Sequence, residues 1–205
     1  MERIFLARHA LARSNEVGLA SFAAPGEGLI HEGVEQARRL GRSLAGEEIA
    51  LGVATELRRT QETLEVALEG RNVPRIIVSE LNEIHFGSFD GGLLSAYRDW
   101  AGSEAPGLPA PGGGESRAQA AARYASGLRT VLARPEESAL VIGHALAVRY
   151  IVDAAEGLVP APLILAPVEH ALSYRMDAGE LELAAGLLET WSLDPRFRVV
   201  DASIP

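Results

Sequence analysis

Two histidines of this chain each follow a short apolar segment. Arg8 and His9 come directly after residues 4–7, and His144 comes directly after residues 139–143. Apolar runs of this length are typical of buried strands in a parallel sheet. In open α/β sheets, ligands bind at the edge formed by the carboxyl ends of the strands. The sequence therefore predicts that two imidazoles and one guanidinium lie at a ligand-binding edge.

Two further predicted strands deliver a second guanidinium and a carboxyl group. The apolar run 49–54 is followed by Arg59, in the first turn of a predicted helix, and the run 75–79 is followed by Glu83. Because parallel strands end at the same edge of a sheet, we expect Arg59 and Glu83 to join the other three side chains there.

This set of side chains suits phosphoryl transfer. A neutral imidazole at His9 can attack phosphorus and form a phosphohistidine. Guanidiniums at Arg8 and Arg59 can bind the phosphoryl oxygens through planar, charge-assisted hydrogen bonds. His144 can donate another hydrogen bond, and it precedes a predicted helix whose N-terminus favours an anion. A carboxylic acid at Glu83 can protonate the leaving oxygen and then act as a base toward water.

The composition of the chain argues against several classes of partner and of catalytic chemistry. The chain has 205 residues and a formal net charge of −9, with a pI near 5.1. Nucleic-acid and anionic-membrane binders need a positive field, so we expect neither partner. Every basic residue is an arginine, which excludes Schiff-base and P-loop lysine chemistry. The sequence has no cysteine, which excludes disulfides, thiolate nucleophiles and iron–sulfur clusters.

Targeting signals are not expected. No uncharged apolar run reaches the roughly 18 residues that a membrane helix needs. The first residues lead straight into a predicted strand, so we expect no signal peptide and a cytoplasmic protein.

The strands are separated by segments with helical periodicity. Apolar residues spaced three and four apart predict helices over 33–46, 95–101, 115–134 and 145–155, and a further helix after an N-cap at Thr55 with Leu57, Gln61, Leu64 and Leu68 on its core face. Residues 105–114 predict a Pro- and Gly-rich loop that could act as a lid.

Alternating strands and helices predict an α/β fold in three α/β/α layers. The sheet should be mostly parallel with one antiparallel edge strand. The tail predicts two strands, 169–176 and 181–186, around a turn at 177–179. We expect one catalytic domain over residues 1–205.

At these motifs the chain resembles the histidine phosphatase superfamily, which includes cofactor-dependent phosphoglycerate mutase. The resemblance covers most of the chain, from residue 3 to residue 176. Arg8-His9-Ala10 resembles the Arg-His-Gly on which the family opens, and Gly143-His144-Ala145 resembles its second His-Gly. Residues 55–63 are similar to the block Ser-x-Leu-x-Arg-x-x-x-Thr, and residues 81–91 resemble the block that carries the acid.

The resemblance implies a metal-independent phosphomonoester hydrolase without a cofactor, acting on a small phosphorylated metabolite. It implies His9 as the nucleophile and Glu83 as the proton donor. The residues implied to hold the substrate are Arg8, Asn15, Arg59, His144 and Ala145. Arg58 and Glu80 are competing candidates beside Arg59 and Glu83, and the family spacing favours Arg59.

Two positions depart from the family pattern, because Ala10 and Ala145 stand where the family has glycine. Glycine permits positive φ and close backbone approach, so the added methyl groups could tighten the pocket or slow the reaction. They suggest one rival function, a catalytically weak protein that binds a phosphate ligand. A second rival is a phosphoglycerate-type phosphomutase, which would use the same residues.

The remaining histidines, His31, His85 and His170, lack metal-ligand spacing, so no metal site is expected. We interpret them as structural or peripheral, with His85 the best candidate for a pocket wall. The expected pocket rim, residues 16–30 and 92–114, carries few positive charges, which argues against polyphosphorylated sugars. A ribazole phosphate, a sugar phosphate or a phosphoglycerate-type substrate stay open. A monomer or a homodimer is expected, and the apolar segment 157–168 is either a contact surface or core.

Overall fold

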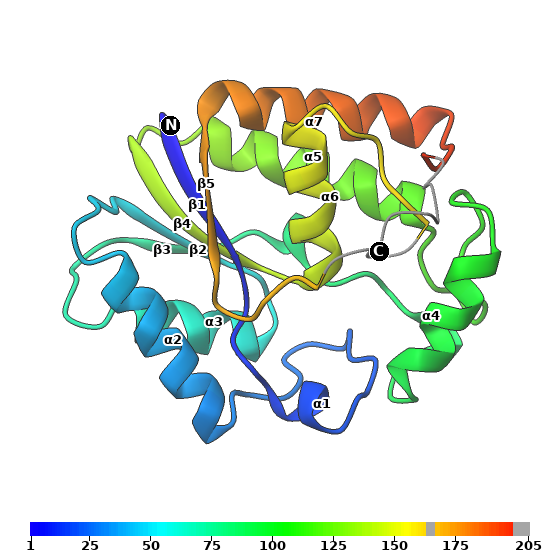
Figure 1. Cartoon of the computed structure of the whole chain (residues 1–205), viewed down its shortest axis with the longest axis horizontal. Helices are drawn as coiled ribbons and strands as arrows, with labels where there is room; N and C mark the ends of the chain where they lie inside the picture. The colour runs from blue at the N-terminus through cyan, green and yellow to red at the C-terminus, as the bar shows by residue number, and fades with distance from the viewer. Residues whose placement is uncertain (163–166, 199–205) are drawn as a thin grey trace.

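A computed structural model of the chain describes residues 1–162 and 167–198, and their elements form three layers (Figure 1). Within these residues the middle layer is a five-stranded sheet in the order β3-β2-β4-β1-β5. Its strands are β1 (Arg3–Arg8), β2 (Leu51–Ala54), β3 (Arg75–Ile77), β4 (Ser138–Gly143) and β5 (Ser173–Asp177). All neighbouring pairs are parallel except β1 with the edge strand β5, which is antiparallel. The predicted fold class is confirmed.

Helices cover both faces of the sheet. Helices α2 (His31–Ser43) and α3 (Arg58–Ala67) pack against each other on one face. The opposite face carries α5 (Arg117–Leu132), α6 (Ala145–Ala155) and α7 (Ala178–Leu193) (Figure 1). Shorter elements lie near the carboxyl ends of the strands: α1 (Arg13–Glu16), α4 (Leu94–Ser103) and the 3₁₀ turns at Ser79–Leu81 and Gly87–Phe89.

The central strands are buried on both sides, which explains their continuous apolar sequences. Successive side chains of a strand point to opposite faces. Ile4 and Leu6 therefore join the core cluster on the α5–α7 side, whereas Phe5 and Ala7 join the cluster under α2 and α3. Each large side chain buried in this way contributes about 1.5–3 kcal/mol to folding.

The tail differs from the sequence prediction. The predicted strand over 181–186 is wrong, because these residues lie in α7. Asp177 and Glu180 form a capping box at the start of this helix: each side chain accepts a hydrogen bond from the other residue's backbone N–H. The buried positions of α7 then follow helical spacing: Leu181, Ala184, Ala185, Leu188 and Trp191.

Three further observations concern the start of α3, the apolar segment 157–168 and membrane-spanning helices. The N-cap of α3 is Leu57 rather than the predicted Thr55, and Gln61 is exposed rather than on the core face. Residues 163–166 of the apolar segment 157–168 lie outside the described residues, while Ala161 and Val168 beside them are buried. No helix in the described ranges combines the length and apolarity needed to cross a bilayer.

Candidate active site

The pairing of β1 with β4 brings His9 and His144 together. Arg8 is in register with Gly143, and the His9 N–H donates to the Gly143 carbonyl at 2.9 Å. β1 and β4 therefore end side by side, and the imidazole centroids of His9 and His144 lie 5.3 Å apart. Both side chains are buried, with His9 only 2% exposed. Hydrogen bonding in the sheet thus fixes the spacing of the two rings.

Arg59 connects the two imidazoles. It lies in the first turn of α3, and it is 3% exposed. Its Nε donates to His9 Nε2 at 3.2 Å, and its Nη2 faces His144 Nδ1 at 3.3 Å. Nη2 also donates to the Ser21 carbonyl at 2.9 Å. The guanidinium is therefore oriented by the loop after β1 as well as by both rings.

These contacts assign the tautomer of each imidazole, because a guanidinium only donates hydrogen bonds. His9 must accept from Arg59 at Nε2, so its proton lies on Nδ1, which donates to the Ala10 carbonyl at 2.8 Å. His144 accepts from Arg59 at Nδ1, so its Nε2–H donates to Thr55 Oγ1 at 3.0 Å. His9 thus presents the lone pair of Nε2 toward the guanidinium.

The surroundings keep both imidazoles neutral. Burial lowers the pKa of His9 well below its usual value, and the positive charge of Arg59 lowers it further. Burial and Arg59 likewise lower the pKa of His144. A neutral imidazole retains the lone pair that a nucleophile needs.

The pKa of Glu83 is shifted in the opposite direction from those of the two imidazoles. Its Oε2 lies 3.9 Å from His144 Nδ1, and its Oε1 accepts from the Ile84 N–H at 3.0 Å. Burial raises the pKa of Glu83, and the nearby charge of Arg59 only partly opposes this. The carboxyl group therefore holds its proton to a higher pH than an exposed glutamate does. A carboxyl group of raised pKa thus lies beside the neutral imidazole of His144.

Arg8 supplies a second, partly buried guanidinium. Its Nη1 donates to the Val168 carbonyl at 2.9 Å, whereas its Nε has no hydrogen-bond partner among the described residues. Burial lowers the pKa of Arg8 to about 10, which leaves it charged at neutral pH. An unsatisfied buried donor beside His9 is suited to an anionic oxygen.

The competing candidates do not join this cluster. Arg58 is exposed and pairs with Glu62 through a 2.6 Å contact. The Glu80 carboxylate accepts from Ser79 in an exposed position. Asn15 is not a competing candidate but a predicted substrate-binding residue. Its side-chain oxygen accepts from the Ala12 N–H at the start of α1, and its role toward the substrate stays a prediction.

The two alanines that replace family glycines have ordinary backbone conformations. Among the described non-glycine residues, the one with positive φ is Ala171, at 55°. Neither Ala10 nor Ala145 therefore needs the conformational freedom of glycine. The Ala10 N–H donates to Thr63 Oγ1 at 2.9 Å, which fixes the backbone next to His9.

Three neighbours of the cluster were not predicted in the sequence analysis. His170, interpreted there as peripheral, donates through Nδ1 to the His9 carbonyl at 2.7 Å, and burial lowers its pKa to about 4. Ser21 orients Arg59, and Thr55 orients His144. Thr55 was within a recognised motif, but the sequence carries no signal for His170 or Ser21.

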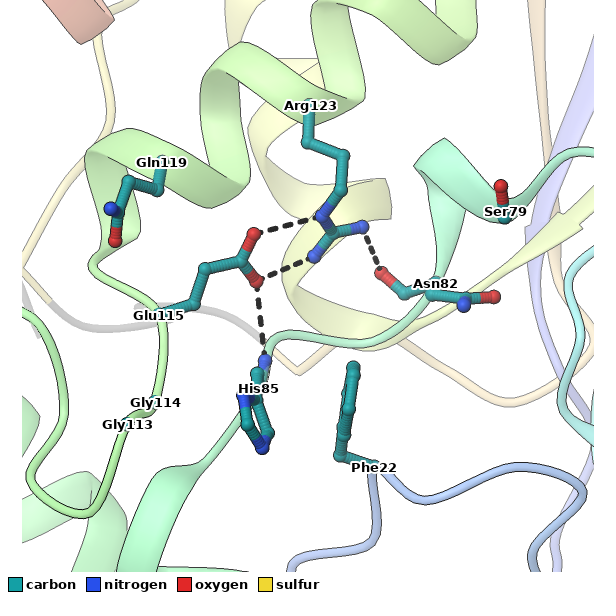
Figure 2. Close-up of a pocket in the computed structure, with 9 residues that line it drawn as sticks. All are labelled: Phe22, Ser79, Asn82, His85, Gly113, Gly114, Glu115, Gln119 and Arg123. Atoms are coloured by element: carbon teal, nitrogen blue, oxygen red, sulfur yellow. Dashed lines mark hydrogen bonds and ion pairs between the residues drawn. The ribbon is translucent and has the colours of Figure 1, made fainter.

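A pocket of about 380 Å³ is lined in part by the segment that carries Glu83 (Figure 2). Its lining includes Asn82 and His85, which flank the acid in sequence. The rings of His85 and Phe22 lie 4.3 Å apart and form one wall. His85 therefore lines a cavity, but the residues that line it include neither imidazole nor guanidinium of the cluster, so its place in the substrate pocket stays a prediction. The opposite wall is an ion pair between Glu115 and Arg123.

The predicted lid, residues 105–114, packs on the segment after the acid. The Ser88 N–H donates to the Pro111 carbonyl at 2.7 Å. Gly87 has φ of 60°, and a Cβ there would lie 2.1 Å from the same carbonyl. Glycine is therefore required at position 87 for the two segments to approach this closely.

Comparison with known proteins gives consistent results. A model of the histidine phosphatase superfamily (branch 1) matches residues 4–180. Adenosylcobalamin/alpha-ribazole phosphatase of Salmonella typhimurium is 38% identical over 88 residues, so the match spans only 43% of each chain. The protein of the same name from Escherichia coli is 29% identical over 189 residues, which cover 86% of each chain. The solved structure of Bacillus stearothermophilus YhfR shares the fold, with a TM-score of 0.75 at 24% identity over 86% of this chain and 92% of that chain.

Proposed function

This chain belongs to the histidine phosphatase superfamily (branch 1), and we propose that it hydrolyses phosphomonoesters through a phosphohistidine at His9. The observation that carries the proposal is the lone pair on His9 Nε2 together with a carboxyl group of raised pKa, Glu83, which lies 3.9 Å from the neighbouring His144. These are the two groups that such a reaction needs, a neutral nucleophile and a proton donor.

The reaction has two steps. In the first, His9 Nε2 bonds to phosphorus, the ester P–O bond breaks, and the Glu83 proton passes to the leaving oxygen. In the second, Glu83 takes a proton from water, whose oxygen bonds to phosphorus while the N–P bond breaks. Phosphate leaves, and both side chains return to their starting protonation states.

Five further residues would hold the phosphoryl group. Arg8 offers its unsatisfied Nε, and Arg59 exchanges its hydrogen bond to His9 for one to a phosphoryl oxygen. His144 caps α6, so the positive end of that helix dipole favours the anion. Asn15 and the backbone at Ala145 complete the set by resemblance to the family.

The names of the relatives and the lining of the pocket support one substrate class. The curated relatives are named alpha-ribazole phosphatases, so a ribazole-type phosphate is the first substrate to test. The Phe22–His85 wall beside Glu83 offers ring surface to a leaving group. The same names favour hydrolysis over the mutase alternative, and the ordinary φ of Ala10 and Ala145 means that neither alanine strains the backbone beside its histidine.

A panel of phosphomonoesters tests this function. Alpha-ribazole 5′-phosphate, p-nitrophenyl phosphate and 3-phosphoglycerate are compared by kcat/KM and by phosphate released. We expect release of phosphate from the first two, with the highest kcat/KM for the ribazole ester. Phosphate binding without turnover would instead favour the weak binder, and isomerisation of phosphoglycerate without phosphate release would favour the mutase.

A further inference from the structure

The segment that carries Glu83 has little regular structure of its own. Glu83 follows the 3₁₀ turn Ser79–Leu81, and residues 83–86 belong to neither a helix nor a strand. A proton donor has to lie within hydrogen-bond reach of the leaving oxygen, and a misplacement of about 1 Å can cost 10²-fold in rate. The position of Glu83 must therefore be fixed from outside the segment.

Arg123 of α5 makes contacts that can do this. Its Nη1 donates to the Glu80 and Asn82 carbonyls, both at 2.9 Å, and its Nη2 reaches the Glu83 carbonyl at 3.3 Å. One guanidinium thus binds the backbone carbonyls of three of the four residues 80–83. Figure 2 shows it pointing from its helix toward this segment.

Glu115 completes the arrangement. Its carboxylate pairs with Arg123 through two hydrogen bonds, of 2.8 Å at Nε and 2.7 Å at Nη2. The same carboxylate accepts from the His85 N–H at 3.2 Å, and the Glu115 N–H donates to the His85 carbonyl at 2.9 Å. Glu115 therefore orients the guanidinium and also holds the backbone on the far side of Glu83 (Figure 2).

We infer that Arg123 and Glu115 are positioning residues for the proton donor, which they hold through backbone contacts on both sides of it. The inference rests on the proposed function, in which Glu83 is the acid. Neither side chain is required to touch the phosphoryl group. Their loss should therefore weaken protonation of the leaving oxygen and leave phosphate binding largely intact.

Rates on esters whose leaving groups differ in basicity can show whether Arg123 and Glu115 position the acid or only stabilise the fold. An aryl ester such as p-nitrophenyl phosphate releases a stabilised phenolate that needs little help from an acid. An alkyl ester such as glycerol 3-phosphate releases an alkoxide that depends on protonation. A badly placed acid should slow the alkyl ester selectively, whereas a general loss of folded protein slows both equally.

The experiment compares Arg123→Lys and Glu115→Gln with wild type on both esters. Lysine cannot make the two-bond pair and hold three carbonyls at once, and glutamine loses the carboxylate charge. We expect kcat on the alkyl ester to fall by about 10–10²-fold and kcat on the aryl ester by about 3-fold or less. Inhibition by inorganic phosphate should stay within about 2-fold of wild type, because the positioning pair lies outside the phosphate site.

A matched control is available in Arg134→Lys. Arg134 pairs with Glu136 through the same two-bond geometry, at 3.0 and 2.8 Å, and its side chain makes no hydrogen bond to residues 80–85 within the described part of the chain. This variant should behave as wild type on both esters. Equal losses on the two esters, or no loss on either, in a folded Arg123 or Glu115 variant would overturn the inference.

The outcome is separable from that of the proposed function. His9→Ala should be inactive on both esters, and retained turnover there would overturn the proposed function and this inference with it. If Arg123→Lys fails to fold, Glu115→Gln carries the comparison alone, since it keeps the size of the side chain.

Discussion

The Nε–H of Arg59 donates to Nε2 of His9 at 3.2 Å, so a buried cation faces the lone pair of a buried imidazole. This contact orients the ring and opposes its protonation. It also occupies the nitrogen that would attack phosphorus. Substrate binding must therefore exchange one hydrogen bond of Arg59 for a stronger, charge-assisted bond to a phosphoryl oxygen.

Replacement of His9 by alanine should reduce turnover by roughly 10³-fold or more, because the substitution removes the atom that forms the covalent bond. The measurement is steady-state phosphate release, together with trapping of labelled phosphoenzyme by rapid quenching. His31→Ala is the control, since His31 is exposed on α2. Phosphoenzyme formed by His9→Ala would contradict the assignment.

Adjacent arginines allow a matched comparison. Arg59→Lys should lower kcat/KM by about 10²-fold, because an ammonium group cannot reach both imidazoles and a phosphoryl oxygen in one plane. Arg58→Lys should change it by less than about 2-fold, because Arg58 pairs with Glu62 on the surface. Similar losses of kcat/KM in both variants would mean that the face of α3 turned toward the site has been assigned wrongly.

The raised pKa of Glu83 predicts how stability depends on pH. A carboxyl group whose folded pKa is raised contributes stability below its unfolded pKa, and that contribution is lost as the pH rises through the folded value. Glutamine cannot ionise, so Glu83→Gln should lose less stability than wild type between acidic and mildly alkaline pH. We expect its Tm to exceed that of wild type by roughly 2–4 °C at the alkaline end only. Thermal unfolding of wild type, Glu83→Gln and the control Glu80→Gln checks this, and parallel curves for wild type and Glu83→Gln would refute it.

Chelation should leave the rate unchanged. The proposed reaction stabilises the phosphoryl charge with Arg8 and Arg59 and draws its proton from Glu83, so no step requires a divalent cation. Initial rates on p-nitrophenyl phosphate are compared before and after dialysis against EDTA, with Mg²⁺ and Zn²⁺ then added back. A loss of rate that a metal restores would point to a different mechanism.

Much of the fold follows from local sequence patterns. Buried strands such as residues 139–143 are recognisable because both faces are covered and every side chain is apolar. The polar residues at four strand ends then predict a shared edge, and the structure brings Arg8, His9, Arg59, Glu83 and His144 together there.

The errors have physical causes. Residues 181–186 are apolar enough to suggest a strand, yet the Asp177–Glu180 capping box and the spacing of Leu181, Ala184 and Leu188 indicate a helix. These signals were present in the sequence and should have outweighed the apolar run. His170 was different, because its contact with the His9 carbonyl depends on how the segment after residue 166 returns to β1, which no local pattern specifies.

The pairing of β1 with β4 also has a consequence for folding. More than half of the chain lies between His9 and His144, and their spacing exists only once these two strands are in register. Contacts between residues so distant in sequence form late, because closing a long loop costs entropy before the contact compensates for it. Recovery of enzymatic activity during refolding should therefore report the completion of the sheet rather than the formation of the helices.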